Sequence, residues 1–390
     1  MKISTFEQGI AQGRAFVSAR FEWEDSDRPV KTIVIRTDAA FAAELDADPN
    51  AFLVAGYLPA LRHGERRLRI DGAVCPSLAG GLARAARVLA FWGGRPGRDL
   101  AIEPASGFRA PRARPGAGDG GLLSGGIDSS HLFLSHASDF PEGHPLSLAS
   151  AFYMEGTDFA EEAESPAAAA YSARVRQRLE AMLAGTATRL VPVWTNVRAL
   201  DPDTDFYARE LLSASFVAGI LALSSRISHL KIASGADAAH LGRWGSHPLI
   251  DPCFSTGALR VSHVGLRFSR GEKIARLSAW PAAVENLVVC NYRPVEPWVN
   301  CGVCEKCVAT MLELTAFGLM GENRSFPFPE VLPERIDRIR DVIGVGHVWR
   351  NIRAALARAG RDDLTPSIDA LLRRTARRNL ARRILRPFRP

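Results

Sequence analysis

The sequence lacks a long apolar run and an apolar leader. No stretch approaches the ~18 apolar residues of a membrane-spanning helix, and the segment from Met1 to Glu7 has no hydrophobic core of the secretory kind. With 47% hydrophobic and 23% charged residues, the composition is that of an ordinary globular protein. We therefore expect a cytoplasmic protein without a membrane span. Its 390 residues exceed the size at which a single core stops growing.

Apart from its C-terminal tail, the chain has almost no excess of positive or negative charge. The formal net charge is +7, but eight arginines near the C-terminus supply more than that, and removing their charges leaves −1. Such a tail predicts attraction to nucleic acid or to an anionic membrane surface. Because Phe388 is its only aromatic residue, a solvated end is the alternative. The eight are Arg373, Arg374, Arg377, Arg378, Arg382, Arg383, Arg386 and Arg389.

Lysine is absent around the most distinctive turn, residues 121–130, which read Gly-Leu-Leu-Ser-Gly-Gly-Ile-Asp-Ser-Ser. The turn follows an apolar run and precedes a helical pattern, so it is predicted to join a buried strand to a helix. A Walker loop would end in Gly-Lys-Ser or Gly-Lys-Thr, and the missing lysine excludes it. A Gly-x-Gly-x-x-Gly pattern at residues 116–121 precedes the strand instead of following it, which excludes the dinucleotide fingerprint.

The residue types in this turn suit an anion. Gly125 and Gly126 let the backbone approach a phosphate closely, and the next helix offers N–H groups and the positive end of its dipole. Ser124 and Ser129 add hydroxyl donors, and the carboxylate of Asp128 is of the type that holds Mg²⁺ against phosphate oxygens. The turn therefore predicts a phosphate site, and a serine-glycine turn without a ligand is the alternative.

From residue 120 onward, strand and helix patterns alternate. This alternation predicts an α/β fold with a mostly parallel sheet covered by helices, in which ligands bind at the carboxyl ends of the strands. The predicted strands are Gly121–Leu123, Ser147–Tyr153, Thr188–Trp194, Leu230–Ala233, Val261–Leu266 and Leu287–Val289. The expected domains are an α+β segment at 1–105, a Gly-, Pro- and Arg-rich linker at 106–118, the α/β domain at 119–325, and a helical extension with the basic tail at 326–390.

Four of the six cysteines stand close together in the sequence. Cys290, Cys301, Cys304 and Cys307 give the pattern C-x10-C-x2-C-x2-C, which supplies four thiolates for a tetrahedral site. Structural zinc is the expected occupant. An iron–sulfur cluster uses the same ligands, and free reduced thiols are a further alternative.

The segment Ser-Gly-Gly-Ile-Asp-Ser at 124–129 resembles the pyrophosphate-binding loop of the N-type ATP pyrophosphatases, the PP-loop superfamily. The resemblance implies about five parallel strands with helices on both faces. It also implies that the loop grips the β- and γ-phosphates of ATP while AMP is joined to a carboxylate or carbonyl oxygen, releasing pyrophosphate. The cysteine pattern adds a similarity to the 7-cyano-7-deazaguanine synthases, which adenylate a carboxylate and convert it to an amide and then a nitrile. Together these resemblances cover about residues 119–320.

A second polar segment follows the fourth predicted strand, at 234–252. Arg243 is a candidate to pair with a substrate carboxylate or phosphate, and His247 or Asp251 to move a proton from the attacking nucleophile. A surface loop whose Asp and His cap helices is the alternative. Asp158 follows the second strand, on the side that faces adenine in the superfamily, and a helix cap is again the alternative.

These residues lead us to expect an enzyme that uses ATP, Mg²⁺ and Zn²⁺ to adenylate a small-molecule or macromolecular carboxylate. Ammonia or an amine would then displace AMP to form an amide or nitrile. Two other hypotheses stay open: sulfur insertion into an RNA base, and a non-catalytic nucleotide-binding subunit. A homodimer is left open as well.

Overall fold

The structure is a computed structural model that describes residues 1–111, 117–155, 165–290, 292, 296–340, 342 and 346–385, with backbone alone for 381–385. Asp158 lies outside the described residues, as do Arg386 and Arg389 of the basic tail. Among the described helices, none combines the length and the apolar character that a membrane crossing requires.

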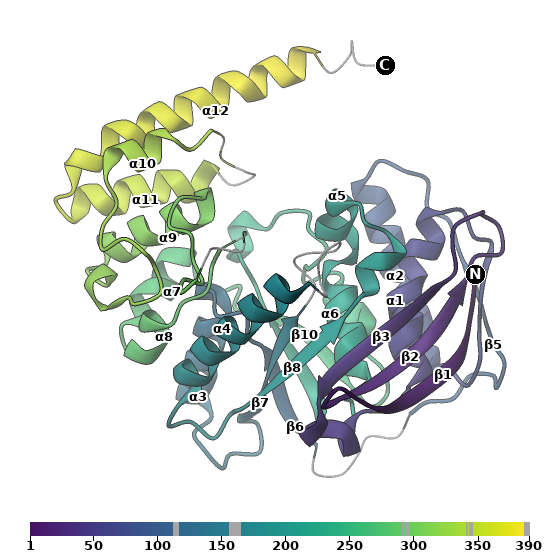
Figure 1. Cartoon of the computed structure of the whole chain (residues 1–390). Coiled ribbons are helices and arrows are strands. Elements are labelled where there is room, and N and C mark those ends of the chain that lie inside the picture. Colours follow the sequence, from purple (N-terminus) through teal and green to yellow (C-terminus); the bar gives the residue numbers. More distant parts are fainter. Residues whose placement is uncertain are drawn as a thin grey trace. The chain divides into compact units, whose positions relative to one another are not determined.

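The described residues contain ten strands, and all of them join one sheet in the order β10-β9-β6-β7-β8-β3-β2-β1-β4-β5 (Figure 1). Neighbouring strands are parallel except at the β8–β3, β3–β2 and β2–β1 pairs, which confirms the predicted α/β fold with a mostly parallel sheet. The strands are β1 (Lys2–Ala11), β2 (Arg14–Glu22), β3 (Lys31–Asp38), β4 (Arg67–Ile70), β5 (Ala101–Pro104), β6 (Gly118–Leu122), β7 (Leu148–Glu155), β8 (Arg189–Thr195), β9 (Ile227–Ala233) and β10 (Arg260–Val264).

Strand β6 lies in the middle of the five parallel strands β10-β9-β6-β7-β8. The chain runs from β6 to β7 and β8 on one side, and then returns to place β9 and β10 on the other. The strand order therefore reverses between β6 and β9. In α/β sheets, ligands bind outside the carboxyl ends of the strands at such a reversal. The turn that follows Leu122 leaves β6 at this end.

Helices lie on both faces of the parallel strands. A Cβ added to Gly121 of β6 would meet Leu132 and Phe133 of α3, whereas a Cβ on Gly219 of α6 would meet Met154 of β7. Because successive residues of a strand face opposite sides of a sheet, these contacts put α3 and α6 on opposite faces. Figure 1 shows α1 and α2 on the same face as α6. The helices are α1 (Pro49–Arg62), α2 (Pro76–Trp92), α3 (Ile127–Asp139), α4 (Pro166–Leu183), α5 (Thr204–Phe206), α6 (Leu212–Leu221), α7 (Arg270–Leu277), α8 (Pro281–Glu285), α9 (Glu305–Ala316), α10 (Pro333–Asp337), α11 (Gly346–Arg358) and α12 (Thr365–Leu385).

The chain divides into two compact units. Unit 1 comprises residues 1–124, 132–172 and 185–267 and holds the whole sheet. Unit 2 comprises residues 125–131, 173–184 and 268–390, and its described secondary structure is helical. These units do not follow the expected boundaries, because β1–β5 continue the sheet of the parallel strands instead of forming one of their own.

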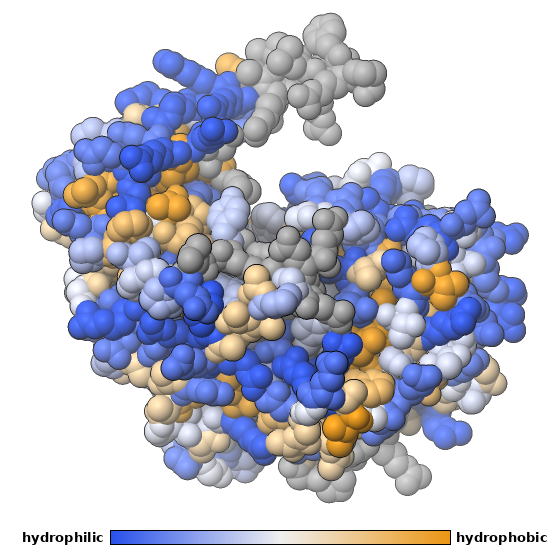
Figure 2. All heavy atoms as spheres, viewed as in Figure 1, coloured by the Kyte–Doolittle hydropathy of each residue, from blue (hydrophilic) through white to orange (hydrophobic). Residues whose placement is uncertain are grey.

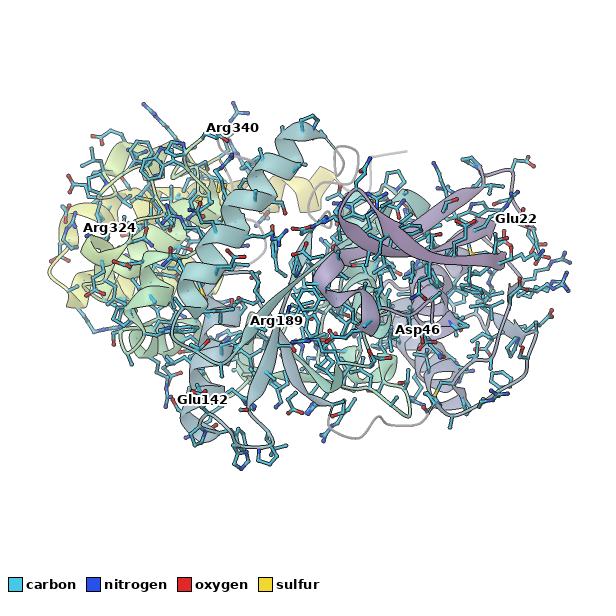
Figure 3. The ribbon with its side chains drawn as sticks, turned by 60° about the horizontal axis from the view of Figure 1, so that its bottom comes forward. Glu22, Asp46, Glu142, Arg189, Arg324 and Arg340 are labelled. Atoms are coloured by element: carbon cyan, nitrogen blue, oxygen red, sulfur yellow. The ribbon has the colours of Figure 1, made fainter. Side chains whose placement is uncertain are left out.

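The seam between the antiparallel and parallel parts of the sheet explains this continuity. Only two residue pairs join β3 to β8, Ile35 with Thr195 and Arg36 with Trp194. Side chains extend the seam: Asn196 accepts from Val34 N at 2.8 Å and donates to Thr32 O at 3.0 Å. Arg189, labelled in Figure 3, begins β8 and lies 4.3 Å from the ring centroid of Phe41 in the segment after β3. Asn196 thus has a structural role in the sheet.

One predicted strand, Leu287–Val289, is wrong. Among the described residues this apolar segment has no strand partner, and it lies as a buried loop after α8. Its backbone is satisfied by other groups, because Val288 N donates to Gly125 O and Val289 N donates to the side chain of Asn300. A short apolar run predicts that a segment is buried, but it does not by itself distinguish a buried strand from a buried loop.

Candidate functional site

The turn after β6 adopts the geometry that its glycines permit. Leu123 N still donates to Phe152 O of β7 at 2.8 Å, and Gly125 then has φ +79°. Helix α3 follows directly, and Ser130 N donates to Gly126 O at 2.9 Å. The predicted strand-turn-helix arrangement is therefore present, with the start of a 13-residue helix at the turn. A helix start of this kind attracts anions.

Gly125 is required by two independent constraints. Its φ lies in the left-handed region, which residues with a Cβ rarely adopt. A Cβ would also lie 2.9 Å from the Leu179 side chain and 3.0 Å from that of Val288. The carbonyl of Gly125 accepts from Val288 N at 2.9 Å, which fixes the turn against the segment after α8.

The two serines of the turn differ in their surroundings. Ser124 is exposed at the end of β6, in unit 1. Ser129 is buried in the first turn of α3, and its hydroxyl donates back to Gly126 O, three residues earlier, at 3.1 Å. A role for Ser129 as a phosphate donor would require this hydroxyl to rotate away from Gly126.

Asp128 is held by two cations of α7 in unit 2. Its carboxylate accepts from Lys273 Nζ at 2.8 Å and from Arg270 Nη1 at 3.2 Å. The Asp128 side chain remains 23% exposed, whereas that of Lys273 is 1% exposed. Burial alone would raise the pKa of Asp128, but Arg270, Lys273 and, more weakly, Lys306 lower it below the usual value. The carboxylate is therefore ionised and partly open to solvent.

A second carboxylate, Glu313 of α9, completes this cluster. It accepts from Arg270 Nε at 2.9 and 3.0 Å, and Thr310 accepts from Arg270 Nη2 at 3.3 Å. Burial raises the pKa of Glu313 and the charge of Arg270 opposes that rise. The charge of Lys306 also acts on Asp128, more weakly than those of Arg270 and Lys273, so three basic side chains influence two acidic ones. A surplus of positive charge of this kind suits an anion.

Sequence reasoning missed Arg270, Lys273 and Glu313. A signal for the first two is present, because Ser269 and Glu272 form a capping box that opens α7 and places Arg270 and Lys273 one turn apart. Only five of the 49 basic residues are lysines, so a lysine in this chain is itself unusual. No local signal identifies Glu313, which becomes a partner of Arg270 only in the folded chain.

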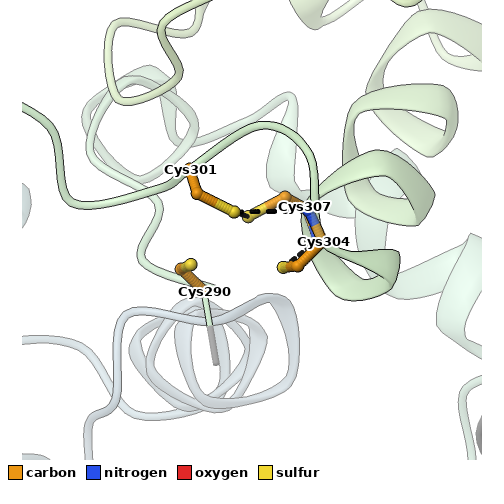
Figure 4. Close-up of side chains that lie close together, drawn as sticks. All are labelled: Cys290, Cys301, Cys304 and Cys307. Carbon is orange, nitrogen blue, oxygen red and sulfur yellow. Dashed lines mark hydrogen bonds between the residues drawn. The ribbon is translucent and has the colours of Figure 1, made fainter. Parts of the chain in front are cut away.

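The four clustered cysteines form a metal-sized cage (Figure 4). All four sulfurs lie within 4.8 Å of one another, and Cys301 Sγ lies 3.8 Å from Cys307 Sγ. A tetrahedral ion with metal–sulfur bonds of ~2.3 Å separates its sulfurs by about 3.8 Å. The residues could thus hold a metal ion such as zinc, as expected.

Local backbone structure positions two of these sulfurs. Cys304 is the N-cap of α9, and its sulfur accepts from Cys307 N at 3.4 Å, while Cys301 Sγ accepts from Cys304 N at 3.3 Å. Hydrogen bonding among the four thiols lowers the pKa of Cys301 and of Cys304, the latter to about 6, and raises the pKa of Cys290 and Cys307. Thiolates are the form that binds metal.

The expected substrate segment of unit 1 has another character. Asp251 is fully buried and accepts from Ser246 Oγ, His247 N and His263 Nδ1 at 2.9, 3.0 and 2.8 Å. His247 is buried with its ring 4.7 Å from that of Trp92, and burial together with the charge of His263 lowers its pKa. This geometry favours the alternative in which Asp251 and His247 organise the loop.

Arg243 of this segment remains accessible, and within the described part of the chain His263 of β10, which contacts Asp251, is unsatisfied at one ring nitrogen. Arg243 is exposed and donates to Trp92 O at 3.2 Å, which leaves most of its guanidinium available to an anion. His263, which sequence reasoning missed, has a buried Nε2 without a hydrogen-bond partner among the described residues. Its Nδ1 is oriented by Asp251.

The basic tail is helical as far as it is described. Arg373 and Arg377 of α12 are exposed, whereas Arg374 and Arg378 donate to backbone carbonyls between Asp337 and Arg340. Figure 2 shows hydrophilic residues over most of the visible face of this helix. Part of the positive charge therefore serves to pack α12 against the loop after α10.

Comparison of the chain with family models, with curated proteins and with solved structures finds no match. The function must therefore be argued from the residues and their geometry.

Proposed function

We propose that the chain is an enzyme of the PP-loop ATP pyrophosphatase type that adenylates a substrate carboxylate and releases pyrophosphate. The observation that carries this proposal is the turn Ser124–Ser129. It combines a left-handed Gly125 and a helix start with Asp128 paired to Arg270 and Lys273. It also follows β6, the strand at which the strand order reverses.

The reaction needs charge neutralisation more than covalent chemistry by the protein. Expelling oxide from a carboxylate is prohibitively slow, and adenylation replaces that leaving group with AMP. Backbone N–H groups at Gly125 and Gly126, together with Arg270 and Lys273, would bind the pyrophosphate oxygens as negative charge develops on them. Mg²⁺ would add charge neutralisation at the phosphates, with Asp128 as its protein ligand.

Asp128 pairs with both Arg270 and Lys273, and these ion pairs suggest how the site would bind a phosphate group without leaving a charge unpaired. Both cations already have a carboxylate partner, so their charges are balanced without ligand. When phosphate and Mg²⁺ arrive together, Asp128 can transfer to the metal while the two cations transfer to phosphate oxygens. Every charge then keeps a partner, which avoids the cost of leaving a buried ion unpaired.

In the second step ammonia or an amine would attack the adenylated carbonyl and expel AMP, giving an amide. In the deazaguanine-synthase type, a second ATP would adenylate the oxygen of the primary amide formed from ammonia, and loss of that oxygen with AMP would give the nitrile. Arg243 is the candidate for the substrate carboxylate or phosphate because it is exposed. Zinc in the four-cysteine cage would be structural, because four protein ligands leave no open coordination position.

ATP–pyrophosphate exchange tests the proposal. With a panel of carboxylic acids, the wild-type chain should exchange label into ATP and form AMP, and Asp128→Ala should lower exchange by at least ~100-fold. Asp363→Ala is the matched control, because it removes an exposed carboxylate of unit 2 that is paired with Arg361 at 2.9 Å. Failure of the wild-type chain to bind ATP would refute the phosphate site.

A second candidate function is sulfur insertion into an RNA base, favoured by the same four cysteines and by the exposed arginines of α12. Metal analysis separates the two. One equivalent of zinc supports amide formation, whereas a brown, oxygen-sensitive protein supports an iron–sulfur cluster and thiolation. ATP binding without turnover in the presence of the true acceptor would instead support a nucleotide-binding subunit.

A further inference from the structure

The four-cysteine cage and the phosphate turn are joined by two separate routes within unit 2. One route runs along α9, whose first turn carries Cys304 and Cys307. The other runs through the buried loop at 287–290, which ends at Cys290. Each route reaches a different residue of the turn.

Helix α9 connects the cage to Asp128. Lys306, Thr310 and Glu313 recur at positions i, i+4 and i+7, so they share one face of the helix. That face holds Arg270 through Thr310 and Glu313, and Arg270 holds Asp128. Glu313 lies six residues beyond Cys307, or ~9 Å along the helix axis.

The helix is also encased, which makes it a rigid connection. Every residue from Cys307 to Leu314 is buried. Its first turn is fixed on another side, because Trp349 Nε1 of α11 donates to Glu305 at 2.9 Å. A helix buried on all sides cannot slide or rotate without disturbing packed side chains. The position of its first turn therefore determines where Glu313 holds Arg270.

The loop at 287–290 connects the cage to Gly125. Val288 N donates to Gly125 O at 2.9 Å, and its side chain packs against the glycine. The buried side chain of Asn300 accepts from Val289 N and Cys290 N at 2.8 and 3.1 Å and donates to Leu287 O at 2.8 Å. Asn300 directly precedes Cys301, so its hydrogen bonds join the backbone next to one cysteine of the cage to the backbone of another, Cys290.

We propose that a metal bound by Cys290, Cys301, Cys304 and Cys307 clamps the phosphate turn, with Glu313, Thr310 and Asn300 as the positioning residues. Bonds from one ion to both segments would fix the loop that holds Gly125 relative to the helix that holds Arg270 and Asp128. The inference rests on the proposed function, since it treats the turn as the ATP site. Its consequence is that metal occupancy and ATP affinity depend on each other, because linkage is reciprocal.

The test measures metal release instead of catalysis. The zinc-loaded full chain is mixed with a chelating dye in excess Mg²⁺, with and without saturating MgATP and without any acceptor acid. At equilibrium with the dye, ATP should reduce zinc release, corresponding to a zinc affinity that is about fivefold or more tighter, the usual range of such coupling. The Kd of MgATP is measured separately by calorimetry.

Two variants locate the route. Glu313→Gln should keep one equivalent of zinc, bind MgATP about tenfold more weakly and lose the effect of ATP on zinc release. Asp369→Asn is the matched control, because it breaks an Arg353–carboxylate pair in the same unit that contacts neither the cage nor the turn. It should behave like the wild-type chain in all three measurements.

The failures are distinguishable. If MgATP binds the wild-type chain but leaves zinc release unchanged, the clamp is refuted and the ATP site stands. If Glu313→Gln retains the full effect of ATP, the α9 route is refuted. If MgATP does not bind the wild-type chain, the proposed function fails and the clamp fails with it.

Discussion

Two aspartates, Asp128 and Asp251, were expected to carry chemistry, and their surroundings differ. Asp128 is paired with the side-chain charges of Arg270 and Lys273 and keeps 23% of its side chain exposed. Asp251 is fully buried and accepts three hydrogen bonds from its own loop and from β10. The first arrangement can exchange partners with a ligand. The second has its oxygens satisfied by groups that hold the fold together.

The comparison shows what separates a binding carboxylate from a structural one. Both residues are acidic, follow a glycine-rich segment and have histidines nearby, so composition does not distinguish them. The distinguishing feature is the net charge around each: the Asp128 cluster holds an excess cation, which an anionic ligand can use. The following predictions test this contrast, from the largest expected effect to the smallest.

Replacing Asp251 should affect stability and not ligand binding. Asp251→Ala removes the acceptor of Ser246, His247 and His263 at a site without solvent access. We expect the free energy of unfolding to fall by about 3 kcal/mol or more, while the Kd of MgATP at 25 °C stays unchanged. Urea denaturation and calorimetry check the two parts. A large loss of ATP affinity with little loss of stability would reverse our assignment of the two aspartates.

Replacing Lys273 should have the opposite pattern. Lys273→Met keeps the length of the side chain but removes the buried ammonium that holds Asp128, and we expect MgATP to bind 10- to 100-fold more weakly, or about 1.4–2.7 kcal/mol. Lys231→Met is the matched control, because Lys231 forms a buried ion pair with Asp119 at 2.5 Å in unit 1. Equal losses of ATP affinity in both variants would contradict a specific role for Lys273.

The turn itself allows a finer test. Gly125→Ala forces a Cβ into left-handed backbone and against Leu179 and Val288. We expect a loss of roughly 1–3 kcal/mol in stability, together with weaker ATP binding. Gly143→Ala is the control, since Gly143 also has positive φ but no atom within 4 Å of an added Cβ. Unfolding curves that match for the two variants would contradict the crowding at Gly125.

The last prediction concerns pH, and its effect is small over any one pH unit. Burial, with Lys273 and Arg276, lowers the pKa of His131 to about 4. Because the unfolded chain binds this proton below pH ~6.5, stability is fully present above that pH. It is lost as pH falls toward 4, by up to about 1.4 kcal/mol per pH unit. His131→Gln should flatten this part of the stability–pH curve. An unchanged slope would show that His131 is not the neutral, buried group that we infer.

The sequence predicts the parallel strands and the turn well, because each depends on local pattern. The runs at 121–123, 147–153, 188–194, 230–233 and 261–266 correspond to β6–β10. Strand β1 is not apparent in the sequence, since a bulge between Ser4 and Glu7 breaks the alternation that identifies a half-buried strand.

The site is predicted less completely, for a physical reason. Glycines and cysteines of a site can be recognised in the sequence, because few other residues can replace glycine in a tight turn or cysteine in a four-thiolate site. The partners of Asp128 come from α7, more than 140 positions along the chain, and Arg270 is in turn paired with Glu313 of α9. Their role depends on tertiary packing, which the local hydrophobic periodicity of the sequence does not predict. The same limit explains why Asp251 was expected to be catalytic.

The seam between β3 and β8 has a consequence for the order in which the chain folds. The β1–β2–β3 meander is built from contacts close in sequence, whereas the partner of Thr37 across the seam is 155 residues away, at Pro192. Local contacts form fast and distant ones slowly. During synthesis the edge of β3 that later pairs with β8 therefore stays unpaired until β8 has been made, and another extended segment can pair with it. In the folded chain β8 pairs with Ile35 and Arg36 of this edge, and the side chain of Asn196 binds the backbone of Thr32 and Val34 beyond them.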